Sequence, residues 1–339
     1  MDRFLSSEEQ DQEQEHHIEQ RSFDKDASLR PKDFSEYIGQ EKVIENISIM
    51  VESAKKREKA MDHVLLSGPP GLGKTSLAMI LSHALSSELH VISGPALEKK
   101  GDLASILTNL APCDVLFIDE IHRLNIVVEE MLYSAMEDFR LDIVIGQGPT
   151  ARTLQIDLPP FTLIGATTRS GLLSHPLRDR FMAHLHFDYY KPKELAVMLG
   201  LNCDKLEITV DSRAIEMIAT CARGTPRIAN RILRRVRDFA VVHDSTLISV
   251  DAVQRCLNLM EIDVHGLDQM DRKILKVIDE FYQGGPVGID ALCATLSEDR
   301  STIEDVYEPF LLKEGLLIRT PRGRANSPKA QAYLKDLKS

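Results

Sequence analysis

The octapeptide at residues 68–75, GPPGLGKT, constrains the fold of this chain more than any other segment. It matches the pattern G-x-x-x-x-G-K-[ST], in which a glycine-rich loop wraps a phosphate group with its backbone N–H groups. The apolar run HVLLS precedes it, and the run SLAMILSHAL, which has the length and composition of a helix, follows it. The sequence therefore predicts a strand, a phosphate loop and a helix whose N-terminus faces the bound anion.

Short apolar runs alternate with segments of helical length between residues 63 and 188. These runs are HVLLS, LHVIS, DVLFID, TLIGAT and HLHFD. Such alternation is typical of a parallel sheet covered by helices, so we predict an α/β domain. Between the third and fourth runs, residues 141–158 form two alternating stretches joined through Gly146, Gly148 and Pro149, which predicts an inserted β-hairpin.

Four amphipathic segments follow Asp188, where the β-like runs stop. They are KPKELAVMLGL, SRAIEMIATCA, TPRIANRILRRVRDFAVVH and SVDAVQRCLNLM. Asp211 and Ser249 stand where N-cap residues are expected, since their side-chain oxygens can accept a hydrogen bond from the first helical turn. We therefore predict a small all-α domain.

A third unit begins near Gly266. MDRKILKVIDEFYQ, GIDALCATL and STIEDVYEPFLLKEGL are predicted helices, and the last is expected to open with a capping box from Ser301 to Glu304 and to be interrupted at Pro309. The basic tail GLLIRTPRGRANS then predicts two short strands around a turn. Three helices followed by a two-stranded ribbon describe a winged helix, a member of the helix-turn-helix class.

The composition argues against membrane-spanning and secreted classes of protein. No apolar run reaches about 18 residues and the N-terminal segment has no secretory h-region, so we expect a cytoplasmic protein. Residues 1–20 are polar and low in complexity, and are expected to be disordered. The five cysteines lack C-x-x-C spacing and are expected to be reduced, mostly buried thiols. A net charge of −11 argues against indiscriminate coating of nucleic acid.

Two adjacent acids close the third apolar run, in DVLFIDE. Asp119 and Glu120 are thereby placed at the carboxyl end of a parallel strand, where ligands of open α/β sheets bind. Lys74 is expected to reach the β and γ phosphates of a nucleotide, and Thr75 to coordinate Mg²⁺. We predict that Asp119 holds the magnesium through water and that Glu120 orients and polarises the attacking water.

Three further polar residues suit a γ-phosphate sensor and a charge clamp. Thr168, in TLIGATT, can hydrogen-bond the phosphate or the water. Arg178 and Arg180, in HPLRDRF, follow a proline-marked turn at the edge of the sheet domain, so an arginine is expected to serve the nucleotide of a neighbouring subunit. On these residues alone, a strand-end threonine and solvated arginines are the alternative interpretations, and whether Arg178 assists Arg180 stays open.

Five motifs together resemble the AAA+ ATPases, and in particular the RuvB family of bacterial branch-migration motors. They are GPPGLGKT, DVLFIDEIHR, GATTR, LRDRF and GTPRIANRILRRVRDFA. The resemblance extends from about Leu29 to about Ala330, and GTPRIAN and RTPRGR are its most specific parts. It implies an ATP hydrolase that requires Mg²⁺, with an AAA+ domain at residues 21–189, a helical lid domain at 190–262 and a winged-helix head domain at 263–336.

The same resemblance implies a set of nucleotide contacts. An adenine pocket would be lined by Leu29, Arg30, Tyr37 and Ile38. Tyr190 would also border the nucleotide, Arg180 would act in trans as an arginine finger, and Arg227 would touch phosphate from the lid as a second sensor. The remaining implied contacts are Gly71, Gly73, Lys74, Thr75, Ser76, Glu137, Asp138 and Phe139.

Partners are implied as well. A homohexameric ring would pull duplex DNA and drive branch migration of Holliday junctions in recombination and repair, with RuvC resolvase in the full complex. The hairpin at 141–158 would dock on the junction-binding protein RuvA, with its apolar tip near Ile145. Arg319, Arg322 and Arg324 of the wing would meet DNA phosphates, with a solvated surface as the alternative. The arginines from residue 223 to 237, except Arg227, are expected to line an exposed face or a subunit contact.

Two other function classes stay open at this point. A clamp-loading or protein-remodelling AAA+ machine would share the nucleotide site, although the C-terminal winged helix speaks against it. A sequence-specific transcription regulator would use ATP as a switch. The three functions can be distinguished by comparing how strongly the ATPase is stimulated by four-way junctions with RuvA, by linear duplex DNA and by protein substrates.

Overall fold

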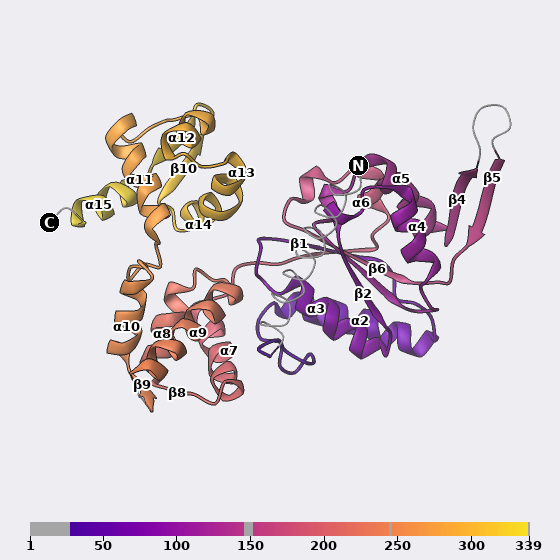
Figure 1. The fold of residues 1–339 in the computed structure, drawn as a ribbon, viewed down its shortest axis with the longest axis horizontal. Coiled ribbons are helices and arrows are strands. Elements are labelled where there is room, and N and C mark those ends of the chain that lie inside the picture. The colour runs from indigo at the N-terminus through magenta and orange to yellow at the C-terminus, as the bar shows by residue number, and fades with distance from the viewer. Residues whose placement is uncertain (1–27, 146–151, 244–245, 338–339) are drawn as a thin grey trace, which may run out of the picture. The chain divides into compact units, whose positions relative to one another are not determined.

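The computed structural model describes residues 28–145, 152–243 and 246–337 (Figure 1). The predicted disorder of residues 1–20 and the turn of the inserted hairpin lie outside the described residues. The chain divides into two compact units. The first consists of residues up to 206 together with 225–230, and the second consists of residues 207–224 and those from 231 onward.

A five-stranded parallel sheet forms the centre of the first unit, as the alternating apolar runs predict. Its strand order is β2-β3-β6-β1-β7. The strands are β1 (Val64–Ser67), β2 (Leu89–Ser93), β3 (Val115–Asp119), β6 (Thr162–Thr167) and β7 (Ala183–His186). Every residue of β6 is buried, as are the first four of β3, because both faces of the sheet are covered.

Helices lie on both sides of this sheet. α2 (Glu41–Arg57) and α3 (Lys74–Leu85) cover one side, and α4 (Lys100–Thr108), α5 (Ile126–Glu137) and α6 (His175–Asp179) cover the other (Figure 1). The short helices η1 (Gly94–Ala96), η2 (Ile121–Arg123) and η4 (Ser170–Leu172) follow the strands, and α7 (Pro192–Lys205) closes the unit. Apolar residues of α4, α5 and α6 pack on the sheet in one core cluster.

The predicted hairpin insertion is confirmed. β4 (Arg140–Ile145) and β5 (Arg152–Asp157) pair antiparallel outside the main sheet, with Leu141 opposite Ile156. Leu141 is fully buried against the core, whereas Leu154 is 48% exposed. The hairpin is therefore anchored at its base, while the apolar side chain of Leu154 stays half exposed.

All four predicted helices after Asp188 form, but the first of them, α7, belongs to the first unit and only the other three lie wholly or mostly in the second. The second unit contains α8 (Ser212–Cys221), most of α9 (Pro226–Val242) and α10 (Val250–Leu259). Both predicted N-caps are confirmed, since Asp211 accepts from the Arg213 N–H at 2.7 Å and Ser249 accepts from the Ala252 N–H at 3.3 Å. Two-residue strands β8 (Thr209–Val210) and β9 (Leu247–Ile248) pair in parallel. They are too short to leave a sequence pattern.

The winged helix is confirmed at the C-terminal end. Its elements are α11 (Gln269–Tyr282), α12 (Ile289–Leu296), α13 (Arg300–Thr302), η5 (Ile303–Tyr307), α14 (Glu308–Lys313), β10 (Leu317–Thr320) and β11 (Gly323–Asn326). A further helix that the sequence analysis missed, α15 (Pro328–Asp336), packs Ala330 and Leu334 into the core of this domain. The elements from α13 to α14 are consecutive, and η5 is a π-helical segment that ends two residues before Pro309. Proline lacks the N–H of a regular helical bond, which accounts for the predicted interruption.

The predicted capping box from Ser301 to Glu304 is wrong. Asp299 is the N-cap and Ser301 lies inside the helix; in the described part of the chain, no side chain caps this N-terminus. The carboxylate of Glu304 instead accepts from Arg300 at 3.2 Å and from Arg324 at 2.8 Å. Two charged partners compete successfully with the backbone N–H that a capping box would use.

The prediction of an exposed arginine face needs one correction. Arg231 and Arg235 are exposed on α9, but Arg223 precedes this helix and its residue is only 9% exposed. Because Arg223 lies outside the helix, the helical spacing of the later arginines does not predict its exposure. Cys203, Cys221 and Cys256 are buried and all five cysteines are free thiols, as expected.

None of the helices in the described part of the chain combines the length and apolar content that crossing a membrane requires.

Candidate nucleotide-binding site

The loop from residue 68 to 75 joins β1 to α3 and forms one wall of a pocket. Gly71 and Gly73 have φ values of +77° and +98°, in the region that favours glycine. A Cβ on Gly73 would lie 2.7 Å from the Tyr37 Oη, and one on Gly71 would lie 2.9 Å from the Thr225 side chain. Both glycines are thus required by conformation and by space.

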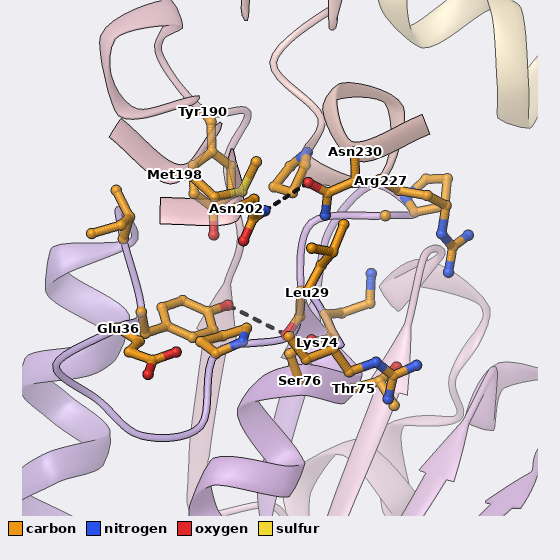
Figure 2. A pocket seen from close by; sticks show the side chains of 18 of the residues that line it. Leu29, Glu36, Lys74, Thr75, Ser76, Tyr190, Met198, Asn202, Arg227 and Asn230 are labelled. Carbon is orange, nitrogen blue, oxygen red and sulfur yellow. Dashed lines mark hydrogen bonds between the residues drawn. The ribbon is translucent and has the colours of Figure 1, made fainter. Parts of the chain in front are cut away.

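The N-terminus of α3 faces this pocket. The helix begins at Lys74 after Gly73, and none of the described side chains caps it. Its first backbone N–H groups are oriented for an anion, and the helix dipole favours negative charge there. Gly71, Gly73, Lys74, Thr75 and Ser76 all line the pocket, as expected from the sequence. Figure 2 shows the last three of them at the start of α3.

Lys74 is held against the loop from which it emerges. Only 7% of the residue is exposed, and its Nζ donates to the carbonyl oxygens of Gly68 at 2.8 Å and Pro69 at 2.9 Å. The pKa of Lys74 is lowered to about 8, because the effect of burial outweighs the opposing effect of the nearby Asp119 carboxylate. A buried ammonium of this kind gains from a polyanion placed beside it.

The two acids at the end of β3 enter the same pocket. Asp119 accepts from the backbone N–H of Glu120 at 2.9 Å, and burial raises the pKa of its carboxyl group. Glu120 has a φ of +48°, and its Oε2 lies 2.9 Å from the Nη1 of Arg123. Arg123 is an unpredicted partner, although a spacing of three residues is one that places side chains together in a helical turn.

Thr168, the first residue after the neighbouring strand β6, lines the pocket as expected. The preceding Thr167 is buried and lies 3.0 Å from His122 Nδ1, measured from its Oγ1. The same oxygen accepts from the backbone N–H of Arg169. The loops after β3 and β6 are thereby linked directly behind the acids.

The opposite wall contains the residues predicted for the adenine pocket. Leu29, Arg30, Tyr37, Ile38 and Tyr190 all line it. The hydroxyl of Tyr37 donates to the Gly73 carbonyl and that of Tyr190 donates to the Leu72 carbonyl, each at 3.3 Å. Burial raises the pKa of Tyr190 to about 12. Both tyrosines thus stay neutral and brace the phosphate loop.

Helices α7 and α9 contribute residues that the sequence analysis missed. Beside the expected Arg227, the pocket is lined by Met198, Leu201, Asn202, Lys205, Pro226 and Asn230. Figure 2 shows Asn202 and Asn230 pointing toward each other, and the Asn202 amide donates to the Asn230 Oδ1 at 2.8 Å. The amphipathic pattern of α7 predicts a buried face but gives no sign that this face meets a ligand.

A salt bridge links α7 to the segment before α2. Lys205 Nζ lies 2.7 Å from Glu36 Oε2 and 3.3 Å from the Arg30 carbonyl oxygen. Glu36 and Pro31 also line the pocket. The segment that carries Leu29 and Arg30 is therefore attached to the wall formed by α7.

Arg180 is not among the described residues that line this pocket. Its guanidinium donates to Glu137 at 2.8 Å and to the Pro176 carbonyl at 2.7 Å, and its Cζ lies 4.7 Å from the centroid of the Tyr133 ring. The side chain is 27% exposed, and Arg178 is exposed. Arg180 is thus held in a fixed position at the surface.

Glu137, Asp138 and Phe139 are likewise not among the described pocket residues. Glu137 is the last residue of α5 and binds Arg180, and Phe139, just beyond the helix, packs on Phe161 with ring centroids 5.8 Å apart. The structure does not bring these predicted nucleotide contacts to the pocket of their own chain.

The three arginines of the wing differ in their surroundings. Arg322 is exposed at the turn between β10 and β11. Arg319 and Arg324 both bind Glu308, at 2.6 and 3.0 Å, and Arg324 also binds Glu304 at 2.8 Å. The Glu308 side chain is fully buried, whereas that of Arg319 is 56% exposed and that of Arg324 is 12% exposed. Glu308 could not be recognised from the sequence, because nothing in its local pattern distinguishes it from an ordinary solvated acid.

Comparison with known proteins gives three adjacent family matches. Residues 29–187 match the Holliday junction DNA helicase RuvB P-loop domain, residues 190–263 match the RuvB AAA lid domain, and residues 264–335 match the RuvB C-terminal winged helix domain.

Whole-chain relatives agree with these matches. A Holliday junction branch migration complex subunit RuvB from Myxococcus xanthus is 56% identical over 310 residues, which cover 91% of this chain and 90% of the relative. One from an Anaeromyxobacter species is 56% identical over 307 residues, with the same coverage. The solved structure of the Thermotoga maritima RuvB Holliday junction branch migration motor is 52% identical, covers 91% of this chain and 98% of its own, and has a TM-score of 0.84.

Proposed function

The chain belongs to the RuvB family, and on that premise we propose that it is the ATP-driven motor of a complex that migrates Holliday junctions. The observation that carries the proposal is one pocket that combines Lys74, Asp119 and Glu120 with Arg227. A P-loop domain and a winged helix on one chain support a protein that would join nucleotide hydrolysis to DNA binding.

The residues present fit a magnesium nucleotide. The loop glycines leave room for a phosphate, the uncapped start of α3 directs N–H groups at it, and Lys74 supplies a buried positive charge. Thr75 and Asp119 line the pocket and would supply oxygen donors for Mg²⁺, which would neutralise charge on the phosphates.

Glu120 is proposed to orient and polarise the attacking water. Its carboxylate stands beside Asp119 at the strand end, and Arg123 holds it at 2.9 Å. Thr168 offers a hydroxyl from the adjacent strand to the phosphate or the water. Arg227 is proposed to contact phosphate from the opposite wall, where its backbone N–H donates to the Gly71 carbonyl at 3.3 Å.

Arg180 is proposed to complete the site of a neighbouring subunit. Four groups hold its guanidinium: Glu137, the backbone carbonyls of Tyr133 and Pro176, and the face of the Tyr133 ring. A preorganised cation at a surface suits a charge that must be presented in trans. The nucleotide contacts proposed for Glu137, Asp138 and Phe139 would belong to the same subunit interface of a homohexameric ring.

DNA and protein partners complete the proposal. The wing would contact phosphates without reading sequence, through Arg322 and Arg319 with Arg324 behind them. The hairpin of β4 and β5 would dock on RuvA, consistent with the exposed Leu154, and RuvC resolvase would join the full complex. We further propose the division into an AAA+ domain at 21–189, a lid at 190–262 and a head at 263–336.

The deciding experiment is a branch-migration assay on a synthetic four-way junction with ATP and RuvA. The protein is expected to convert the junction to products, and Glu120→Gln is expected to bind nucleotide but neither hydrolyse it nor migrate the junction. Glu130→Gln, an exposed acid on α5, is the matched control and should remain active. ATP-dependent activity on linear duplex or protein clients alone, with none on junctions, would contradict the proposal.

A further inference from the structure

A buried guanidinium occupies the core of the second unit. Arg223 lies in the turn between α8 and α9, and 8% of its side chain is exposed. Its Nε donates to the Gly266 carbonyl at 2.7 Å, and its Nη2 lies 2.9 Å from Asp268 and 2.6 Å from Asp271. Gly266 and Asp268 immediately precede α11, so one side chain on the lid holds the start of the head domain.

Arg223 also contacts the helix that precedes the wing. Its Cζ lies 4.7 Å from the centroid of the Phe310 ring, which is buried in α14. A planar guanidinium can bind two carboxylates and a carbonyl at its edge while its face stacks on an aromatic ring. A lysine ammonium at this position cannot make all four contacts, so the geometry is specific to arginine.

Removing the salt bridge between Arg223 and Asp271 would be strongly destabilising. The Asp271 side chain is fully buried, and burial raises its pKa to about 7 while Arg223 acts to lower it. A buried carboxylate without its cation is strongly unfavourable. The head domain is thus bound to Arg223 by charge as well as by packing.

The chain immediately after Arg223 leads to the nucleotide pocket. Arg223 and Gly224 have φ values of +58° and +72°, and the chain passes from the second unit to the first after Gly224. Thr225 is the residue that a Cβ on Gly71 would meet at 2.9 Å, and Arg227 lines the pocket. Three residues therefore separate the guanidinium that holds the head domain from the arginine that faces the nucleotide.

We propose that Arg223 is a positioning residue that attaches the winged-helix domain to the segment carrying Arg227, so that a nucleotide-dependent shift of that segment moves the head. This inference rests on the proposed function and names the element that couples ATP turnover to DNA movement. Arg223 takes no part in hydrolysis itself. Removing its contacts therefore affects the work done per ATP rather than the rate of hydrolysis.

The test uses full-length Arg223→Lys, which keeps the charge but loses the fork and the ring contact. The ATPase rate without DNA is expected to stay within about twofold of the wild type, whereas ATP consumed per junction migrated rises at least about fivefold, the lower end of ordinary coupling between sites. The double variant R223M/D271N removes the cation and the buried charge together, so no unpaired buried charge is left. It is expected to give the same uncoupling and serves as the test if the lysine variant folds poorly.

Arg237→Lys is the matched control. Arg237 lies on α9 and binds its neighbour Asp238 at 2.8 Å with 36% of its side chain exposed, so its replacement should leave the ratio of ATP to migration unchanged. Wild-type coupling in both Arg223 variants would overturn the inference, and so would a parallel loss of basal hydrolysis and migration. If the wild-type protein itself failed to migrate junctions, the proposed function would fail instead, and the two failures are distinguishable.

Discussion

Glu308 in the winged helix provides a sharp prediction about stability. Its fully buried carboxylate accepts from Arg319 Nε at 2.6 Å, from Arg324 Nε at 3.1 Å and from Arg324 Nη2 at 3.0 Å. Burial raises the pKa of Glu308, but the hydrogen bonds from the two arginines outweigh it and hold the pKa below its usual range. The folded domain therefore favours the ionised form.

Glu308→Gln removes the charge and preserves the shape. Breaking a buried ion pair costs about 3–5 kcal/mol, and we expect about 3 kcal/mol because the amide oxygen can still accept from the arginines and Arg319 is largely exposed. Of the two acids that bind Arg324, Glu304 would remain, at 2.8 Å. Because the wild-type pKa is lowered on folding, the carboxylate contributes stability at neutral pH that is lost as the pH falls through the folded pKa. The glutamine variant should lack this acid dependence.

Hydrogen exchange of the full-length protein is the appropriate assay, since it measures opening free energy for each segment. Amides of β10, β11 and α11 should exchange roughly 100-fold faster in the variant at neutral pH, which corresponds to about 3 kcal/mol. Glu314→Gln is the control, because Glu314 is 40% exposed and lies 3.7 Å from Lys329, a pair worth at most about 1 kcal/mol. Equal exchange in the two variants would refute the role assigned to Glu308.

Three further predictions concern other parts of the chain. Arg180→Ala should bind nucleotide but lose about 10³-fold or more in ATPase rate, as expected for a finger arginine, whereas full turnover would remove the trans role; Arg178→Ala in the same assay shows whether Arg178 assists. Gly73→Ala should abolish nucleotide binding in calorimetry because the new Cβ would lie 2.7 Å from the Tyr37 Oη, and wild-type affinity would contradict this. Cys221 should resist iodoacetamide at about pH 8, where a thiol of pKa about 11 is about one part in a thousand thiolate; labelling as fast as in unfolded protein would disprove its burial.

Much of the fold could be predicted from the sequence because its periodicities are local. Buried parallel strands show as continuous apolar runs, and the phosphate loop fixes which strand and helix it joins. The caps Asp211 and Ser249 depend on neighbouring N–H groups, so they were also predictable. The capping box at Ser301 failed because Arg324, twenty residues beyond Glu304, takes up the carboxylate.

In the candidate site too, residues within local motifs could be predicted, whereas residues brought in by the tertiary fold could not. Lys74, Thr75, Asp119 and Glu120 lie in motifs whose chemistry is visible in a few residues. Asn202 and Lys205 belong to α7, and only the tertiary fold brings them to the pocket. Arg223 and Glu308 were misjudged or missed for a related reason, since burial of a charged residue depends on distant partners that local spacing does not reveal.

Mixed rings test the central claim most directly, namely that each nucleotide is held by one subunit and completed by an arginine from the next. Glu120→Gln and Arg180→Ala proteins should each be inactive alone, but an equal mixture should recover about a quarter of the wild-type ATPase, because one interface in four would pair an intact pocket with an intact finger in a ring of head-to-tail contacts. A mixture that is no more active than either variant alone would contradict the account.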